Sequence, residues 1–476
     1  MPDHPDQSHT FGGGVNDSIL SPIVLAGLIV ASLLIVVLPR RYVIVPFLLC
    51  TFLVPEGQQV YTLGVHFFVL RILILVGWAR ALRSLSSSKG SLFAGGFNLI
   101  DQAFLLCMLC QAICMVLQYM QSQALINQLG FLIDYLGGYF LLRYLIRNRD
   151  DTYTAIKCLA FIAVVLALFM VREQLTLQNA FGSLGGVQLV PDVREGKIRS
   201  QGVFQHALMA GCFAASLLPL FFLLWKTGKA KIVAVMGAIG CTVMTITSQS
   251  STPLLAYVGG VLAICLWPVR KNMRAVRWGI VIVLLALAMV MKAPVWFVIA
   301  HIDLTGGSSG YHRAELIDQF VRHFSDWWLI GTKDAGTWGW DLWDAQNQYV
   351  NVGETGGLLA FGLFIAVISR CCSRIGNARK AASGKNRAEW FVWLVGAALF
   401  VHLVSFFGVN YFDQSKVNWF VLLAMISAIT LPKPAAKAEP SAVLADEQAG
   451  DLIPAEAELL NIEQRGEGWP GLQEWA

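Results

Sequence analysis

Long apolar runs, separated by short polar stretches, set the pattern of this chain. A helix needs about 20 mainly apolar residues to cross roughly 30 Å of membrane hydrocarbon, and it satisfies its own backbone groups there. Thirteen runs of this kind predict transmembrane helices at 18–38, 42–54, 62–79, 99–119, 125–146, 154–171, 203–225, 232–247, 253–269, 278–300, 356–370, 388–409 and 417–431. We therefore expect an all-α polytopic membrane protein with about 13 transmembrane helices.

The composition agrees with a membrane protein. The chain has 476 residues, of which 56% are hydrophobic and 14% are charged, and its mean hydropathy is +0.61. A soluble domain carries about 25% charged residues, so this chain cannot cover a water-facing surface in the usual way. The ten cysteines lie mostly in apolar runs, and no basic stripe alternates with polar surface. These features exclude a disulfide-built extracellular domain and a nucleic-acid-binding protein.

Lysine and arginine are unevenly divided between the connecting segments. Alternate segments, beginning with Arg40 and Arg41 and ending with the C-terminal tail, hold 24 of the 35 basic residues, whereas the opposite segments hold nine. Because basic residues gather in cytoplasmic loops, the N-terminus is expected outside the cytoplasmic membrane and the C-terminus inside. We expect a short periplasmic segment at 1–17, a transmembrane domain at 18–431 and a disordered acidic cytoplasmic tail at 432–476.

Two of the predicted outer loops are long, at 172–202 and 301–355. Long loops in a compact protein commonly carry function, and the inner side has no Walker loop, Rossmann fingerprint or acidic metal cluster. We therefore expect the chemistry in the periplasmic loops. An amphipathic helix is predicted at the outer interface over 314–324, because apolar residues recur there at helical spacing; they are Leu316, Ile317, Phe320, Val321 and Phe324.

Arginines in these loops are candidate ligands for an anion. Arg199 stands just before an apolar run, Arg313 falls at the start of the amphipathic helix, and Arg322 lies near its end. Each has two interpretations. A guanidinium can simply anchor the chain to lipid headgroups, or it can hold a diphosphate with two hydrogen bonds, which a lysine does less well.

Tryptophans follow the amphipathic helix. Trp338, Trp340 and Trp343 alternate with Asp341 and Asp344. Aromatic faces beside carboxylates suit the apolar face and the hydroxyls of a sugar, which makes this segment a candidate glycan-binding surface. The alternative is that these tryptophans belong to the aromatic belt of the membrane interface.

Charged residues also occur inside the predicted spans. Arg71 and Asp134 lie at similar depths below the outer ends of their helices, so an ion pair between them is feasible. Charges at this depth are functional candidates, although a structural pair is an equal alternative. Arg143 is expected to reach the cytoplasmic interface, and we assign it no role in the site.

Spacing of cysteine and histidine gives no metal prediction. Cys107, Cys110 and Cys114 share one stripe of an apolar helix without histidine or charged neighbours, so we expect them to pack rather than to bind metal. The histidines of the outer loops, His312 among them, show no zinc-site spacing. We predict no metal and no cofactor.

Three stretches together resemble one family. They are Arg-Ser-Gln-Gly-Val-Phe-Gln-His at 199–206, Thr-Ser-Gln-Ser-Ser-Thr at 247–252, and the close of the large loop with Gln-Asn-Gln-Tyr at 346–349 and Glu-Thr-Gly-Gly at 354–357. In order and loop placement they resemble the bacterial O-antigen ligase and polysaccharide polymerase superfamily. The likeness covers about residues 40–431.

The resemblance implies a glycosyltransferase of the bacterial inner membrane. Such enzymes transfer a glycan from undecaprenyl diphosphate to an acceptor hydroxyl on the periplasmic face, and Arg199 and Arg313 match the positions that hold the diphosphate. Asn347 and Tyr349 belong to the closing motif. Ligases have a histidine where Gln346 stands, and a glutamine cannot act as a general base, which favours a polymerase-like member. His312, Asp341 and Asp344 are then the candidate bases.

Other functions fit the sequence as well. A ligase would transfer the glycan to a lipid A core. A transporter or flippase of envelope precursors would use Arg71 and Asp134 along a pathway, and a third alternative is a non-enzymatic subunit of an envelope assembly. The expected partners of the transferase are the lipid-linked oligosaccharide, a glycan acceptor, membrane lipids and other polysaccharide-assembly proteins, without nucleic acid.

Overall fold

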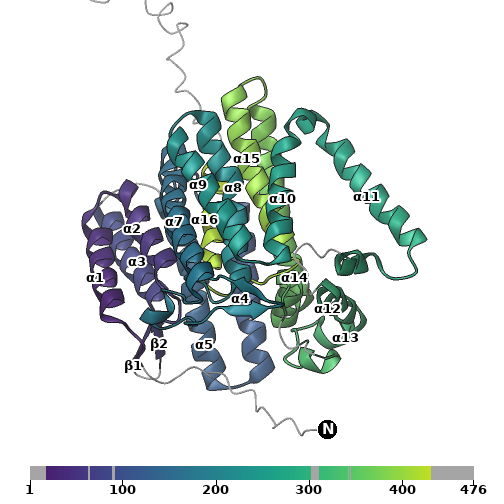
Figure 1. The fold of residues 1–476 in the computed structure, drawn as a ribbon, viewed down its shortest axis with the longest axis horizontal. Coiled ribbons are helices and arrows are strands. Elements are labelled where there is room, and N and C mark those ends of the chain that lie inside the picture. Colours follow the sequence, from purple (N-terminus) through teal and green to yellow (C-terminus); the bar gives the residue numbers. More distant parts are fainter. Residues whose placement is uncertain are drawn as a thin grey trace, which may run out of the picture. The chain divides into compact units, whose positions relative to one another are not determined.

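A computed structural model gives the fold (Figure 1). It describes residues 18–62, 65–87, 92–301, 310–340, 342 and 345–429. The predicted periplasmic segment 1–17, the predicted acidic tail 432–476 and three candidate site residues lie outside the described residues; these three are Asp341, Trp343 and Asp344.

Helices make up almost all of the regular structure. The α-helices are α1 (Pro22–Val37), α2 (Arg40–Leu53), α3 (Val69–Ser87), α4 (Leu99–Tyr119), α5 (Ser122–Leu132), α6 (Gly138–Leu145), α7 (Arg149–Thr176), α8 (Ala207–Thr227), α9 (Lys231–Thr247), α10 (Ser251–Cys265), α11 (Met273–Val290), α12 (Gly310–Arg322), α13 (Phe324–Trp327), α14 (Gln348–Ala381), α15 (Asn386–Ser405) and α16 (Ser415–Ile429). A π-helical turn, η1 (Ile133–Gly137), joins α5 to α6, and short 3₁₀ turns are η2 (Gly182–Leu184), η3 (Trp267–Asn272), η4 (Val295–His301) and η5 (Ala335–Trp338). The strands form two antiparallel hairpins, β1 (Gln59–Thr62) with β2 (Val65–Phe68) and β3 (Asp192–Arg194) with β4 (Lys197–Arg199).

Every one of the thirteen apolar runs contains a helix. Within the described residues, seven helical segments are long and apolar enough to cross a membrane. They are Leu99–Tyr119, Ser122–Leu145, Arg149–Thr176, Ala207–Thr227, Trp267–Val290, Gln348–Ala381 and Asn386–Ser405. Four further apolar helices, α1, α9, α10 and α16, are shorter. The chain is thus an all-helical protein with helices suited to a membrane.

The predicted start of the third span was wrong. Residues 59–68 form the β1–β2 hairpin, and helix α3 begins only at Val69. The hairpin is held by the segment before α1, because Ile19 and Gln59 exchange two backbone hydrogen bonds of 3.0 and 2.8 Å. A second boundary was also wrong, since η4 occupies the end of the run predicted at 278–300.

Helix α14 begins at Gln348, eight residues before the predicted span. It is broken at Gly357, whose φ of 68° lies in the left-handed region. The break frees backbone groups that the turn after α13 satisfies: Leu358 N donates to Trp328 O at 2.9 Å, and Thr332 N donates to Glu354 O at 2.8 Å. The Glu-Thr-Gly-Gly motif therefore joins the large loop to α14.

Replacing Gly357 by alanine should destabilise the fold. A Cβ atom there would lie 2.5 Å from Leu329 O, and a left-handed conformation costs a side-chain-bearing residue about 1–2 kcal/mol. Gly362 in the same helix has open space around its Cα, so Gly362→Ala is the matched control and should stabilise the helix by up to about 1 kcal/mol. Thermal unfolding in detergent should give a lower Tm for Gly357→Ala only. Equal melting of the two variants would show that the break is not required.

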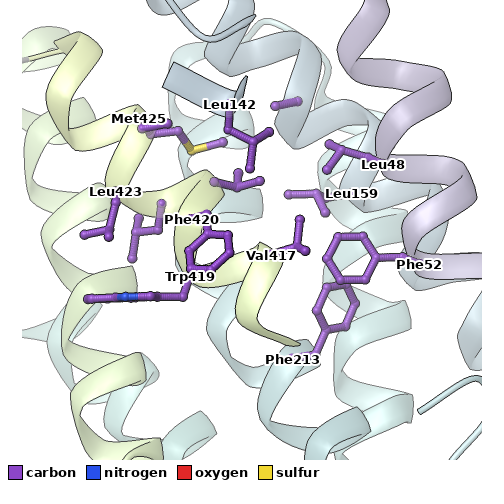
Figure 2. Close-up of a cluster of buried hydrophobic side chains, with 14 of the residues drawn as sticks. Leu48, Phe52, Leu142, Leu159, Phe213, Val417, Trp419, Phe420, Leu423 and Met425 are labelled. Carbon is purple, nitrogen blue, oxygen red and sulfur yellow. The ribbon is translucent and has the colours of Figure 1, made fainter. Parts of the chain in front are cut away.

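Helix α16 forms the centre of the fold. All of its residues are buried, as expected for a helix that is apolar on every side. Figure 2 shows Val417 and Phe420 of α16 among side chains of several other helices, including Phe52 of α2 and Phe213 of α8. The rings of Phe52 and Phe213 lie 4.7 Å apart. The core thus unites elements from both ends of the sequence.

Small residues allow other helices to approach closely. At Gly240 of α9, an added Cβ would lie 3.0 Å from backbone atoms of Ala163 in α7, a contact typical of helix packing in membranes. The cysteine stripe of α4 packs on α14, where Cys107 Sγ lies 3.5 Å from Ala360 O and Cys114 Sγ lies 3.5 Å from Gly356 O. These cysteines pack between helices, as the sequence predicts.

Arg143 does not reach the cytoplasmic interface, so that expectation was wrong. Its side chain is fully buried and holds Asp101 with two hydrogen bonds of 2.9 and 3.0 Å. Tyr139 donates a third hydrogen bond to Asp101 at 2.5 Å. Asp101 also accepts from the backbone of Asn98 at the start of α4. The pair therefore joins the beginning of α4 to α6 inside the core.

Candidate functional site

Hydrogen bonds connect the first motif of the family resemblance to the C-terminal ends of α7 and α9. Gln174 of α7 donates to Ile198 O at 2.6 Å and to Thr247 O at 2.8 Å. Glu173 accepts from the backbone nitrogens of Gln201 and Gly202 at 3.1 and 2.9 Å. These bonds hold the segment that carries Arg199 against the C-terminus of α9, so the first and second motifs lie together.

The second motif forms the tight turn into α10. Gln249 has a φ of 44°, which is uncommon for a residue other than glycine. The turn directs the N-terminus of α10 toward Arg199, whose Nη2 lies 3.4 Å from Ser250 Oγ. A helix N-terminus carries partial positive charge and directs backbone N–H groups outward, which makes it suited to an anion.

Arg313 approaches the same place from α12. Its side chain is buried with 8% of the residue exposed, and Nε has no hydrogen-bond partner among the described residues. Burial, together with the neighbouring charges of Arg199 and Arg194, lowers the pKa of Arg313 to about 10. Burial also lowers the pKa of Arg199. Cationic groups held together in this way are stabilised by a bound anion.

A cavity of about 250 Å³ opens beside Arg313. Its walls come from the first turn of α10, from η4, from α15 and from the segment after α15; they include Ser251, Thr252, Ile299, Val404 and Gly408. A side chain at Gly408 would collide with Thr252, so the glycine lets the segment after α15 approach α10. The cavity combines an arginine and a helix N-terminus with apolar walls, and we call it the cationic cavity.

The closing motif lies behind the wall of this cavity. Asn347 caps α14, because its Oδ1 accepts from the backbone nitrogens of Tyr349 and Val350 at 2.9 and 3.2 Å. Its Nδ2 lies 3.4 Å from the backbone oxygen of Phe407, which lines the cationic cavity. Tyr349 donates to Leu403 O at 3.2 Å. Gln346 is half-buried just before the cap. The motif thus supports the wall of the cavity.

Helix α12 buries only part of the apolar face that the sequence predicts. Arg313, Leu316 and Phe320 are buried, whereas Val321 and Phe324 are exposed. The buried face therefore places Arg313 inside the protein. His312 is half-buried beside it and does not line the cationic cavity.

Arg322 lies on the outer surface of α12. Its side chain is 67% exposed and forms an ion pair of 2.6 Å with Asp318, four residues earlier. The structure therefore separates Arg322 from the pair formed by Arg199 and Arg313. It remains a predicted substrate-binding residue at the surface.

The tryptophans of the large loop lie in different surroundings. Trp338 is buried and stacks on His323 with ring centroids 5.1 Å apart, so its face is already covered. Trp340 is 88% exposed. Within the described part of the loop, only a separate surface around Trp340 remains open for the predicted stacking on a sugar.

Arg71 and Asp134 form the ion pair that the sequence makes feasible. Arg71 donates from Nε and Nη2 to the two carboxylate oxygens of Asp134 at 2.9 and 2.7 Å, and from Nη1 to His66 O at 2.5 Å. Both residues are buried. The pair connects α3 and the β1–β2 hairpin to η1. Both charges therefore stabilise the packing of these elements.

A second buried pair was missed. Lys416 at the start of α16 donates to Glu56 Oε1 at 2.6 Å; the lysine is buried and the glutamate is partly buried. In the sequence Lys416 counts as a loop residue before an apolar run, and Glu56 lies in a short turn. The sequence shows only that the basic residue Lys416 precedes an apolar run. Nothing in the sequence indicates that Glu56 is its partner.

The site's chemistry is that of anion binding. The described residues contain no group of three or more His, Cys, Asp or Glu side chains placed to hold a metal ion. Arg313 and the first turn of α10 line an apolar-walled cavity. Arg199 lies beside them, because it contacts Ser250 at the start of α10 and its charge acts on Arg313. No protein-family model matches the chain, and no curated protein matches it.

Proposed function

We propose that this protein is a membrane glycosyltransferase that polymerises glycan units carried on undecaprenyl diphosphate. The observation that carries the proposal is Arg313, a buried arginine beside the cationic cavity whose Nε has no partner in the described part of the chain. Arg199 and the N-terminus of α10 add positive charge at the same place. A diphosphate attached to a lipid provides both the anion and the apolar group that such a cavity accommodates.

The reaction uses these groups on the leaving diphosphate. An acceptor hydroxyl attacks the anomeric carbon of the lipid-linked sugar, a new glycosidic bond forms, and the bond from that carbon to the diphosphate oxygen breaks. Arg199, Arg313 and the helix N-terminus stabilise the negative charge that develops on this oxygen. The hydroxyl proton leaves to a base, for which His312, Asp341 and Asp344 remain the candidates.

Two observations favour a polymerase over the alternatives. Gln346 stands where ligases have a histidine, which argues against transfer to a lipid A core. A transporter would use Arg71 and Asp134 along a pathway, yet each has the other as its hydrogen-bond partner. The charges that need a ligand are those of the arginines at the cationic cavity.

In the proposed topology, thirteen helices cross the bacterial inner membrane. The N-terminus and the loops that carry Arg199 and Arg313 face the periplasm, and the C-terminus faces the cytoplasm. Exposed residues on the two sides make this testable: Gln188 in the smaller outer loop and Lys380 near the end of α14. In spheroplasts, with Cys265 and Cys372 replaced by serine, a membrane-impermeant maleimide should label Gln188→Cys directly and Lys380→Cys only after lysis. The reverse order would invert the topology.

The activity is tested with the purified protein in lipid nanodiscs and an undecaprenyl-diphosphate-linked oligosaccharide. The expected products are longer lipid-linked glycans and free undecaprenyl diphosphate, one for each unit added. Vesicles containing the protein provide the second arm. Uptake of the lipid-linked oligosaccharide without any new glycosidic bond would instead establish a transporter.

A further inference from the structure

A second cavity lies in the core behind the cationic cavity. Its volume is about 150 Å³, which admits several water molecules or one sugar ring. The two cavities share a wall: Phe407 and Gly408 line the cationic cavity, whereas Phe406 and Tyr411 line the second one. We call the second one the neutral cavity, for the reason given below.

Amide side chains dominate the polar lining of the neutral cavity. The polar residues come from α4, α5, α14 and α16, and they are Gln111, Gln128, Gln348, Asn351, Thr355 and Lys416. Lys416 is paired with Glu56 at 2.6 Å, so it adds little net charge. The lining therefore offers hydrogen bonds without favouring an anion, in contrast to the cationic cavity.

Several of these groups have unused hydrogen-bonding capacity. Among the described residues, the side-chain amide of Asn351 makes no hydrogen bond. Gln128 uses only its Nε2, at 3.2 Å from Asn127 Oδ1, and Gln348 uses only its Oε1, which accepts from Tyr411 N at 2.8 Å. Unused amide donors and acceptors inside a hydrophobic core are costly unless a polar ligand or water satisfies them.

Aromatic rings complete the walls. Phe131 and Tyr135 lie 4.2 Å apart, and Phe420 and Trp419 contribute from α16. The hydroxyl of Tyr135 is fixed by its hydrogen bond to Tyr411 O at 3.0 Å. Aromatic faces and amide groups together match a pyranose, which has apolar C–H faces and a rim of hydroxyls.

We propose that the neutral cavity is a binding subsite for one uncharged pyranose ring of the glycan. The subsite rests on the proposed function, because it lies across a shared wall from the cavity assigned to the diphosphate. The subsite would let the protein select the sugar. The cationic cavity recognises the diphosphate and does not provide this selection. The amides of Gln128, Gln348 and Asn351 would bind the hydroxyls.

Photolabelling tests the subsite without requiring turnover. The full-length protein in nanodiscs is exposed to a panel of neutral diazirine-bearing glycosides of glucose, galactose and N-acetylglucosamine, and the labelled peptides are identified by mass spectrometry. At least one glycoside should label the start of α14, α4 or α5. Labelling should fall about tenfold in Asn351→Leu and in Gln128→Met, since each change removes hydrogen bonds worth about 1–1.5 kcal/mol.

The control variants separate this subsite from the proposed transferase. Gln102→Met changes an exposed glutamine of α4 and should leave labelling unchanged. Arg313→Ala should abolish glycan transfer but keep the labelling. A wild-type protein that is labelled but transfers no glycan would refute the transferase and retain the subsite.

Competition identifies the source of the ring. A free neutral oligosaccharide that competes would assign the subsite to the acceptor, and competition by the lipid-linked oligosaccharide alone would assign it to the donor. Thermal unfolding identifies a variant that fails to fold. If Asn351→Leu or Gln128→Met fails to fold, the labelling of the remaining variant tests the subsite. Absence of labelling in the wild type, or equal labelling of wild type and both variants, would overturn the subsite.

Discussion

Arg313→Lys is expected to reduce glycan transfer by about 10- to 100-fold at neutral pH. A lysine keeps the charge but loses the planar pair of donors that holds a diphosphate, and a hydrogen bond to a charged group contributes about 1.5–3 kcal/mol. The rate of undecaprenyl diphosphate release, measured with the purified variant, checks this expectation.

The same substitution should make activity sensitive to alkaline pH. Burial lowers the pKa of Arg313 to about 10, so the guanidinium stays protonated up to about pH 9 and the wild type should keep its charge there. An ammonium has an ordinary pKa of about 10.4, below that of a guanidinium, and the same burial would lower the pKa of a lysine at this position. The lysine cation would be present below its lowered pKa and lost as the pH rises through it.

Arg172 offers a matched control, because it lies exposed near the C-terminal end of α7. Arg172→Lys should retain the wild-type rate and pH profile. If Arg313→Lys and Arg172→Lys behaved alike from pH 7 to pH 9, Arg313 would not contact the diphosphate.

Asp101→Asn should destabilise the protein by about 3–5 kcal/mol, because it leaves the cation of Arg143 buried without a counter-charge. Asparagine keeps a side-chain oxygen that can accept from the backbone of Asn98 at the start of α4. The lost stability therefore measures the missing charge and not a missing helix cap. Unfolding in detergent with increasing dodecyl sulfate measures the change in free energy.

The double variant Asp101→Asn/Arg143→Met should recover most of the lost stability, since it removes the unpaired cation. Breaking the ion pair of Asp318 with Arg322 by Arg322→Met should cost less, because Arg322 is 67% exposed and Trp296 still donates a hydrogen bond to Asp318. A small effect of Asp101→Asn, similar to that of Arg322→Met, would show that Arg143 finds water or another partner.

The helical architecture could be predicted from the sequence because an apolar run of sufficient length has few other structures available in a membrane. Boundaries were less predictable. The residues of the β1–β2 hairpin, such as Val60 and Val65, are as apolar as a helix would be, so composition does not separate the two. The Asp101–Arg143 pair was missed because its partners are 42 residues apart and only the folded chain brings them together.

The two central arginines were predictable as candidates, but their positions were not. Arg199 and Arg313 are 114 residues apart in the sequence, and spacing alone assigned the apolar face of α12 to Leu316, Ile317, Phe320, Val321 and Phe324. In the structure only part of that face is buried, and Arg313 is buried with Leu316 and Phe320. The neutral cavity could not be predicted, because its amides come from three helices, α4, α5 and α14, that no local pattern connects.

The most direct measurement of the central claim is the Kd of undecaprenyl diphosphate for the protein in nanodiscs at fixed ionic strength. Two lost charge-assisted contacts of about 1.5–3 kcal/mol each predict binding at least about 100-fold weaker for the double variant Arg199→Ala/Arg313→Ala. Arg172→Ala should bind like the wild type. Equal affinity of the double variant and the wild type would contradict the assignment of the cationic cavity to the diphosphate.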